Sequence, residues 1–483
     1  MPPGIVIVGL GPGNPGQITL EAWRVIENAP EVYLRTKRHP SVAALPARTT
    51  YHSFDHLYET LSSFAQVYEE IACSIVALGR RSQGVVYAVP GHPLVGETSV
   101  SRILELTEAE GPPTRIVAGV SFLEPTTAAL RIDPFDGLQI CDAMILAQRH
   151  HPCLNPDVAA LIVQLYSRQL ASDVKITLMN LYHDDHPIKI VRCAGTQRQQ
   201  VCELPLYALG RQDELGHLTS VYIPPLARPG SIASYQDLVA RLRAPDGCPW
   251  DRQQTHQSLR THLLEETYEV LAALDADDMD ALKDELGDLM LQILLHVQLA
   301  TEAGDFKLID TVQQVIEKLV RRHPHVFGDA TADSPSDVLR NWERIKRREK
   351  GGGSISMLSG IPVALPALSR AQEMQRRAAR VGFDWPSVEP VMDKVIEEIK
   401  EFRAAPEVKG QASELGDLLF SLVNLARWYD IDAESALREA DQRFARRFAA
   451  IERHANDAGI SLEDMNLEAM DALWEEIKRQ EGG

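Results

Sequence analysis

The sequence predicts an α/β domain followed by two related all-α units, and three observations support this fold class. The first 225 residues alternate short apolar or β-branched runs with helix-like segments, an order typical of a largely parallel sheet. From about residue 235 the strand signals disappear and long amphipathic helical patterns follow. These patterns fall into two similar blocks, which the flexible stretch "GGGSISMLSG" separates.

These changes in the secondary-structure pattern along the sequence predict the domain boundaries. The α/β domain is expected over 1–228, where the Pro/Gly/Ser-rich connector "IPPLARPGSIAS" begins to lead out of it. The first helical unit is expected over 235–350, the linker over 351–360 and the second helical unit over 361–483.

Apolar or β-branched runs that end in loops predict the strands of the α/β domain. Helix-like stretches lie between them, such as "ITLEAWRVIENA" and "LVGETSVSRILELTEAEG". The expected strands are "GIVIVGLG" (4–11), "GVVYAVPG" (84–91), "TRIVAG" (114–119), "DAMILAQ" (142–148) and "VKITLMNL" (174–181).

Glycine-bearing turns follow three of these strands, at 9–16, 90–97 and 118–124. One such turn is often only a tight turn. The first turn also departs from a dinucleotide fingerprint, which has an acidic residue about 20 positions on for the ribose. Glu31, next to Pro30, is a poor candidate for that role. Three turns at strand ends could together line a cofactor cleft.

The charge balance and the cysteines limit the classes of partner. The chain has 483 residues, with 49 Lys and Arg against 68 Asp and Glu, and a formal net charge of −19. Such an acidic chain argues against broad binding to nucleic acids or anionic membranes, although a local cluster can still hold phosphate. The six cysteines include no CxxC pair, which predicts reduced thiols in a cytoplasmic protein. No apolar run approaches the roughly 18 residues of a membrane helix, and the N-terminus indicates a strand and loop rather than a signal peptide.

The helical region carries one acidic motif twice, as EExxE followed by ExxD. Residues i, i+3 and i+4 share a helix face, so antiparallel helices would bring these carboxylates face to face. Such carboxylates repel one another unless a cation neutralises them, and an all-oxygen donor set favours Mg²⁺ or Mn²⁺ over zinc. The acids are Glu265, Glu266, Glu269, Glu285 and Asp288 in the first block (copy one), and Glu397, Glu398, Glu401, Glu414 and Asp417 in the second (copy two).

Other residues recur in the same order. Gly287 and Gly416 lie inside helices at a cost near 1 kcal/mol relative to Ala, which suggests that a facing backbone or a ligand comes close. Basic and aromatic residues downstream suit a nucleoside triphosphate, because cations pair with phosphate and an indole can stack on a base. They are Lys318, Arg321, Arg322, Trp342 and Lys346 in copy one, and Arg443, Arg446, Arg447, Trp474 and Lys478 in copy two.

Each of these features alone is more often a solvated face or part of a core. Their recurrence in both copies favours a metal–nucleotide site. A di-iron oxidase is the other class of protein that arrays glutamates on facing helices, but its sites need ExxH pairs where this chain has ExxD.

Residues from about 235 to 480 closely resemble the MazG family of nucleoside triphosphate pyrophosphohydrolases. The phrases that carry the resemblance include "CPWDRQQTHQSLRTHLLEETYEV", "ELGDLMLQILLH", "RRHPHVFGD" and "RAARVGFDW". It implies an all-α fold and Mg²⁺-dependent hydrolysis of a nucleoside triphosphate to the monophosphate and pyrophosphate, with damaged nucleotides as housecleaning substrates. Helical units of this kind often pair to finish a four-helix core, and the two copies could pair within one chain or between chains; a homodimer is expected.

The resemblance assigns roles by position. It implies nucleotide contacts at Lys394, Arg443, Arg447, Trp474 and Lys478, although the family tends to have Lys where this chain has Arg443. The implied metal ligands of copy two are Glu398, Glu401, Glu414 and Asp417. Glu397, Glu398 and Glu401 are the candidate catalytic carboxylates, and their spacing leaves open which is base and which is ligand.

Copy one retains candidate metal ligands but differs at one position. His262 occupies the place of Lys394. We therefore expect copy two to be the hydrolase and copy one to be weak or structural. The candidate ligands of copy one are Glu266, Glu269, Glu285 and Asp288.

Residues 4–225, with their three glycine turns and the closing "TSVYIPP", resemble the tetrapyrrole methylase family. The resemblance implies S-adenosylmethionine bound between two α/β subdomains. One departure, His92 where corrin and haem-pathway members commonly have Asp, leaves the methyl acceptor open. The alternative is a ligand-binding regulator of the hydrolase that methylates nothing. The implied contacts are Gly9, Gly11, Pro12, Gly13, Pro90, Gly91, His92, Gly119, Val120 and Ser121.

Overall fold

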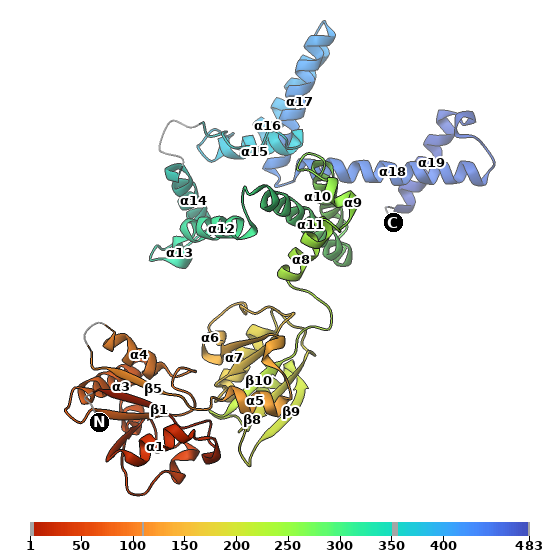
Figure 1. The fold of residues 1–483 in the computed structure, drawn as a ribbon. Helices are drawn as coiled ribbons and strands as arrows, with labels where there is room; N and C mark the ends of the chain where they lie inside the picture. Colours follow the sequence, from red (N-terminus) through yellow and green to blue (C-terminus); the bar gives the residue numbers. More distant parts are fainter. Residues whose placement is uncertain (1–3, 109–110, 350–355, 482–483) are drawn as a thin grey trace. The chain divides into compact units, whose positions relative to one another are not determined.

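The computed structural model describes residues 4–108, 111–349 and 356–481 (Figure 1). The chain divides into two compact units, Met1–Leu238 and Val239–Gly483. The division falls inside helix α8, just beyond the predicted connector. Each unit is described by itself.

The first unit opens with a parallel five-stranded sheet of order β3-β2-β4-β1-β5. Helices α3 and α4 pack on one face, where Ile7 and Tyr87 are buried, and α1 packs on the other, where Val8 is buried. Because both faces are covered, the central strands are apolar throughout. The strands are β1 (Ile5–Gly9), β2 (Glu31–Leu34), β3 (Thr50–Ser53), β4 (Val85–Val89) and β5 (Thr114–Val117), and the helices are α1 (Leu20–Asn28), α2 (Asp55–Thr60), α3 (Phe64–Gly79) and α4 (Thr98–Thr107).

A second five-stranded sheet follows, of order β6-β7-β10-β8-β9. Only β6 and β7 pair in parallel in it, whereas β10 and its neighbours and the β8–β9 pair are antiparallel. The expected α/β fold is thus confirmed, but its parallel sheet is only the first of two. The elements are α5 (Leu123–Leu130), β6 (Leu138–Asp142), α6 (Ala143–Ala147), β7 (Ala159–Val163), α7 (Arg168–Leu178), β8 (Pro187–Arg192), β9 (Gln200–Pro205) and β10 (Thr219–Ile223).

Two predicted strands were wrong, because 142–148 is mostly helix α6 and 174–181 continues helix α7. Asp142 caps α6 by accepting hydrogen bonds from the backbone N–H groups of Met144 and Ile145. In α7, Leu170, Val174 and Leu178 recur at helical spacing and are buried in the core of the second sheet. Tertiary burial of one helix face therefore outweighs the β propensity of the run.

The second unit is helical and repeats one order of helices. In copy one, α10 packs on α11 and α12 packs on α14; in copy two, α16 packs on α17 and α18 packs on α19. The helices are α8 (Ile232–Arg243), α9 (Pro249–Gln253), α10 (Arg260–Asp275), α11 (Met279–Ala303), α12 (Leu308–Arg322), α13 (Pro324–Phe327), α14 (Pro335–Glu349), α15 (Ala367–Ala379), α16 (Glu389–Ala404), α17 (Val408–Trp428), α18 (Ala433–Asp457) and α19 (Leu467–Glu481).

Polar contacts hold the helices of this unit in place. The buried amide of Gln375 in α15 donates to the Phe420 carbonyl of α17 at 2.8 Å. Arg438 of α18 lies 2.8 Å from Asp275 of α10, which ties copy two to copy one. No helix among the described residues is both long and apolar enough to cross a membrane.

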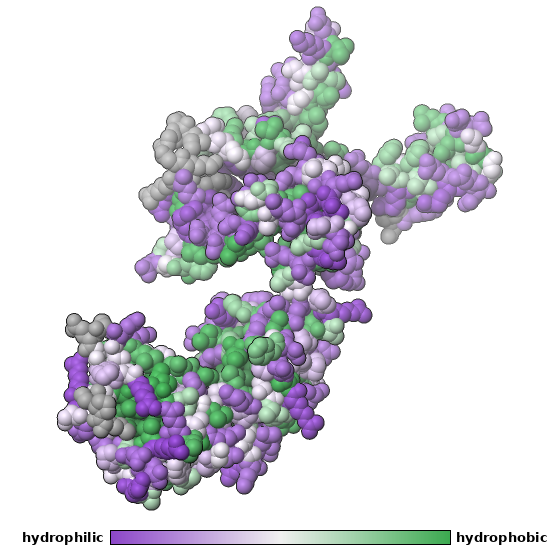
Figure 2. All heavy atoms as spheres, in the orientation of Figure 1, coloured by the Kyte–Doolittle hydropathy of each residue, from purple (hydrophilic) through white to green (hydrophobic). Residues whose placement is uncertain are grey.

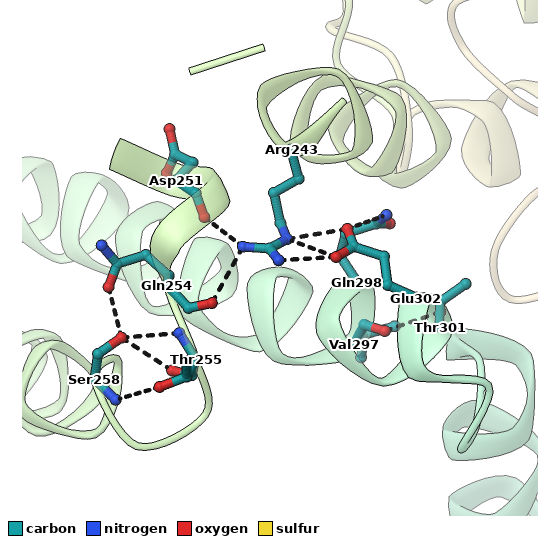
Figure 3. A network of polar contacts seen from close by, with 9 residues as sticks. All are labelled: Arg243, Asp251, Gln254, Thr255, Ser258, Val297, Gln298, Thr301 and Glu302. Carbon is teal, nitrogen blue, oxygen red and sulfur yellow. Dashed lines mark hydrogen bonds and ion pairs between the residues drawn. The ribbon is translucent and has the colours of Figure 1, made fainter. Parts of the chain in front are cut away.

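Arg243, at the end of α8, forms the centre of a network that fixes the start of copy one (Figure 3). Its guanidinium pairs with Glu302 of α11 at 2.8 Å and donates to the backbone carbonyls of Asp251 and Gln254. Only 6% of the Arg243 side chain is exposed. One planar fork thus joins α8, α9 and α11.

Arg243→Ala should lower the stability of α8, α9 and α11 by roughly 2 kcal/mol, because Glu302 and two carbonyls lose their partner. Arg241→Ala is the matched control, since its pair with Asp246 on the same helix end is 67% exposed on both sides. It should cost less than about 0.5 kcal/mol. Hydrogen exchange of the amides in these helices measures both values, and equal losses would contradict the assignment.

Candidate functional site

Helices α16 and α17 bring three carboxylates of copy two together. One oxygen each of Glu398, Glu401 and Glu414 lies within 4.8 Å of the other two. Glu398 and Glu401 are one turn apart on α16, and Glu414 comes from α17. Asp417 follows Glu414 by one turn and is exposed. This is the face-to-face arrangement that the repeated motif predicts.

Lys394 belongs to this carboxylate group. Its Nζ lies 2.9 Å from Oε1 of Glu398 and 2.8 Å from Oε1 of Glu397, and these acids raise the pKa of the lysine. The other oxygen of Glu398, Oε2, is buried and has no hydrogen-bond partner among the described residues. A buried carboxylate oxygen without a partner is costly, and a cation would satisfy it.

The donor set of copy two therefore fits a divalent metal ion. All the available atoms are carboxylate oxygens, which hard cations such as Mg²⁺ and Mn²⁺ prefer. The three carboxylates, including that of Glu398, would hold such an ion between α16 and α17.

Copy one forms a similar group from Glu266 of α10 with Glu285 and Asp288 of α11, in which Glu266 and Glu285 correspond to Glu398 and Glu414 of copy two. Burial and the neighbouring carboxylates raise the pKa of Glu266 and of Glu285. Glu269 contributes to both shifts, so it lies beside the group. This like-charge crowding is what a bound cation would relieve.

The substitution of histidine for lysine in copy one has a local consequence. His262 Nδ1 lies 3.0 Å from Glu265, just as Lys394 contacts Glu397 in copy two. Lys394 also reaches Glu398, and in copy one burial and the neighbouring carboxylates raise the pKa of the corresponding acid, Glu266. The two carboxylate groups thus have two corresponding acids in common but differ in the basic residue beside them.

The Arg–Trp contact also occurs in both copies. The Arg447 guanidinium of α18 lies over the Trp474 ring of α19, 5.4 Å from its centroid, and Phe444 packs against the same ring. In copy one, Arg322 of α12 lies 5.1 Å from the centroid of Trp342 in α14. The predicted basic and aromatic residues therefore form a cation–π pair in each copy.

The remaining predicted nucleotide contacts pair with acids on their own helices. Arg443 lies 3.4 Å from Glu439, and Lys478 lies 3.5 Å from Glu475. They belong to the α18–α19 pair, whereas the carboxylates and Lys394 belong to the α16–α17 pair. The structure thus brings the predicted residues together in two groups, on two different helix pairs.

The glycines inside the acidic motifs do not face a nearby backbone. A Cβ on Gly287 or Gly416 would meet no atom of another part of the described chain within 4 Å. The predicted close approach of backbone is therefore wrong within the chain. Open space lies instead beside Gly287, next to Asp288, and beside Gly416, next to Asp417.

The three glycine turns of the first unit meet at the ends of neighbouring strands β4, β1 and β5. Gly11 and Gly91 exchange backbone hydrogen bonds of 3.3 and 2.8 Å. A Cβ on Gly9 would lie 2.5 Å from the Gly91 oxygen and 2.7 Å from the Gly119 Cα, so the close approach requires glycine. Gly91 itself has φ +65°, and a Cβ there would point into open space.

The other predicted cofactor contacts lie around this junction. Pro12 and Gly13 are buried, and Gly13 neighbours Thr196 of the second sheet's loops. His92, half-buried like Pro90, accepts from the Leu94 backbone N–H at 3.1 Å. Following β5, half-buried Val120 precedes Ser121, which is buried and donates to Glu124 at 2.6 Å.

A buried polar cluster beside these turns escaped the sequence reasoning. Arg35, which follows β2, lies 3.3 Å from Glu97, the residue that ends the second glycine turn. Ser99 donates to Glu97 and shares a hydrogen bond of 2.8 Å with Tyr87. Burial raises the pKa of Glu97, while Arg35 opposes the shift. The one available signal was the acid directly after "PGHPLVG".

Two family models match the chain. The model of tetrapyrrole (corrin/porphyrin) methylases matches residues 4–210, and that of the MazG nucleotide pyrophosphohydrolase domain matches residues 254–327, which lie in copy one. The nucleoside triphosphate pyrophosphohydrolase/pyrophosphatase MazG of Thermotoga maritima is 44% identical over 247 residues, 50% of this chain and 95% of that protein. This chain belongs to the MazG family. Its MazG region follows a tetrapyrrole methylase-like domain, as the sequence predicted.

Other similar proteins cover different parts of this MazG-family chain. The uncharacterized protein YabN of Bacillus subtilis is 43% identical over 491 residues, 99% of each chain, and so matches both units. A solved structure of uroporphyrin-III C-methyltransferase from Thermus thermophilus covers 46% of this chain and 92% of its own, at 22% identity and a TM-score of 0.37.

Proposed function

We propose that the chain hydrolyses nucleoside triphosphates to monophosphates and pyrophosphate, and that copy two is the principal active site. The observation that carries the proposal is the buried Oε2 of Glu398, which has no hydrogen-bond partner among the described residues and belongs to a group of three carboxylates on a MazG-family scaffold. The proposed cellular role is cytoplasmic housecleaning of damaged nucleotides.

In copy two, we assign metal binding and proton acceptance to different carboxylates. Glu398, Glu401 and Glu414, with Asp417 one turn away, would hold Mg²⁺ or Mn²⁺, which when bound polarises the α-phosphate and lowers the pKa of the attacking water. Glu397 is exposed and outside the three-carboxylate group, so its acceptance of the water's proton would not compete with metal binding. We assign the base to Glu397 and keep Glu401 as the alternative.

The cationic group would hold the nucleotide. Arg443, Arg447 and Lys478 would pair with phosphate oxygens, and the Trp474 indole, which lies beside Arg447, would stack on a base. Open space beside Gly416 leaves room for a phosphate next to the carboxylates. A complete site requires an α18–α19 pair to come against an α16–α17 pair.

We further propose that two chains associate through the helical units. Large apolar side chains on α16 and α17 are 45–49% exposed, which is unusual for helices that carry a repeated apolar pattern. Figure 2 shows hydrophobic residues at the surface of α17, the helix at the top of the view. A second copy would cover this face and complete a four-helix core. The residues are Ile396, Leu415, Leu419 and Phe420.

For the first unit we propose binding of S-adenosylmethionine at the junction of the three glycine turns. Backbone crowding at Gly9 and Gly119, beside open space at Gly91, supports a ligand that approaches the main chain closely. Methyl transfer needs alignment of acceptor, methyl carbon and sulfur more than an acid–base residue. A regulator that binds the ligand without transferring a methyl group is the alternative.

Glu398→Gln in the full chain should reduce pyrophosphate release from a panel of nucleoside triphosphates by at least about 100-fold, because a ligand of the activating ion is lost. The double variant Glu266→Gln/Glu269→Gln removes the matching acids of copy one and should change the rate less than about threefold. The exposed Glu452→Gln serves as a control for charge. A folded Glu398→Gln variant with full turnover would refute the assignment, and a large loss in the copy-one variant would refute the division of roles.

Gly91→Ala should weaken S-adenosylmethionine binding by about tenfold or more, because its methyl group would enter the open space assigned to the ligand. Gly459→Ala is the matched control, since Gly459 has φ +67° and equally open surroundings in the helical unit. Both substitutions carry similar backbone strain, about 1 kcal/mol. Calorimetry with S-adenosylmethionine measures binding, and a search for methylated product separates methylase from regulator. If Gly91→Ala binds S-adenosylmethionine with unchanged affinity, the proposal that this ligand binds at the junction is wrong.

In sedimentation equilibrium the chain should have about twice its mass of 53.6 kDa. Leu419→Glu should yield monomers, because a charge in the shared apolar face is costly. Leu20→Glu, at a residue that is 63% exposed in the first unit, should leave the dimer intact. A monomeric wild-type chain, or dissociation by both variants, would contradict an interface on α17.

A further inference from the structure

In copy one, the arginine pair Arg321–Arg322 of α12 already binds an anion. This anion is the side chain of Glu349 in α14. Glu349 is the last residue of α14 and accepts hydrogen bonds from Arg321 Nε at 2.7 Å and from Arg322 Nη2 at 2.6 Å. Arg322 Nε also donates to Glu349 Oε2, the oxygen that accepts from Nη2, at 3.2 Å. The Arg322 and Glu349 side chains are only 14% and 19% exposed.

One of these arginines, Arg322, occupies the place of Arg447, a nucleotide contact assigned in copy two, and Arg321 occupies the place of its neighbour Arg446. In each copy the second arginine lies over the tryptophan of the last helix, at 5.1 Å in copy one and 5.4 Å in copy two. The carboxylate group expected of a metal–nucleotide site is also present in copy one. The corresponding residues are Arg321, Arg322 and Trp342 in copy one, and Arg446, Arg447 and Trp474 in copy two.

The charge and geometry of the contact suit a phosphate better than a single carboxylate. Two guanidinium groups converge on one carboxylate, which leaves an excess positive charge that a polyphosphate would neutralise. The two arginines lower the pKa of Glu349 to about 2, so this carboxylate is ionised at neutral pH. Glu349 is thus an ionised carboxylate in contact with both arginines.

We propose that Arg321, Arg322 and Trp342 form a polyphosphate-binding subsite in copy one, which Glu349 closes until a triphosphate displaces it. The identity of the ligand rests on the proposed function. Displacement is feasible because the Arg321 side chain is 56% exposed, and because a triphosphate brings more negative charge to both arginines than one carboxylate does. Only noncovalent contacts are exchanged.

The sequence repeat has an acid at the corresponding position of both copies. "WERIKRRE" ends at Glu349 and "WEEIKRQE" ends at Glu481, each with glutamate seven residues after tryptophan. An acid at this place therefore accompanies the arginine pair in both copies of the sequence. The competing interpretation is a clasp that only holds α14 on α12, and it predicts no response to phosphate.

The decisive variant is Glu349→Gln in the full chain, with Arg446→Ala/Arg447→Ala added to silence copy two. Inorganic triphosphate, titrated by calorimetry without divalent cations, should bind this chain roughly threefold to tenfold more tightly than the same background with Glu349 intact. Glu317→Gln, an exposed acid on α12, is the charge-matched control and should have no such effect. Equal or weaker binding after Glu349→Gln would overturn the proposal.

Two further measurements identify the ligand and protect the test against misfolding. Trp342→Ala should weaken ATP binding but not inorganic triphosphate binding if the subsite takes a nucleotide; equal effects would leave free polyphosphate as its ligand. In the wild-type chain, triphosphate should speed hydrogen exchange in the last turn of α14, and unchanged exchange would overturn displacement. None of these measurements depends on turnover, so failure of the hydrolase proposal remains distinguishable.

Discussion

Repulsion between carboxylates on facing helices is the main constraint on the helical unit. It occurs in both copies, because each has a group of three carboxylates. In copy two, Lys394 offsets part of the charge by contacting Glu397 and Glu398. In copy one, His262 contacts Glu265, and burial together with the neighbouring carboxylates raises the pKa of Glu266 and Glu285. A fold that needed only stability would bury apolar side chains at these positions. Retaining the acids in both copies is consistent with a function for the cation that would neutralise them.

The sequence could predict the carboxylate groups because their geometry is local. Residues such as Glu398 and Glu401 share a face through helix periodicity alone, and a second acidic helix close in sequence completes the group. The split between the carboxylates and the Arg447–Trp474 pair was not predictable, since spacing along the chain does not say which helices pack together. For the same reason the β-branched run at 174–181 misled the strand prediction: its burial against a second sheet decides its structure, and that sheet includes residues far along the chain.

In the first unit, the predictable feature was the set of glycine turns, because the close approach of their backbones requires glycine. Gly9 and Gly119 tolerate no side chain where three turns cross, and glycines are visible in a sequence. The Arg35–Glu97 pair was not predictable, because its partners are ordinary charged residues 62 positions apart that gain importance only through burial. Both features lie at the carboxyl ends of parallel strands, where open α/β sheets bind their ligands.

The two groups of the helical unit have opposite electrostatic needs. The carboxylate groups require a cation, and the arginine pairs require an anion, which Glu349 provides in copy one. A metal–triphosphate complex carries both charges in one ligand, with the metal bound to the phosphate oxygens. Such a complex would give a partner to the Glu398 oxygen, which has none in the described part of the chain, and would also bring phosphate to the arginines. Each half of the site would then bind the complex better than either component alone. This mutual dependence gives a physical reason why acids, arginines and tryptophan recur as one set in both copies.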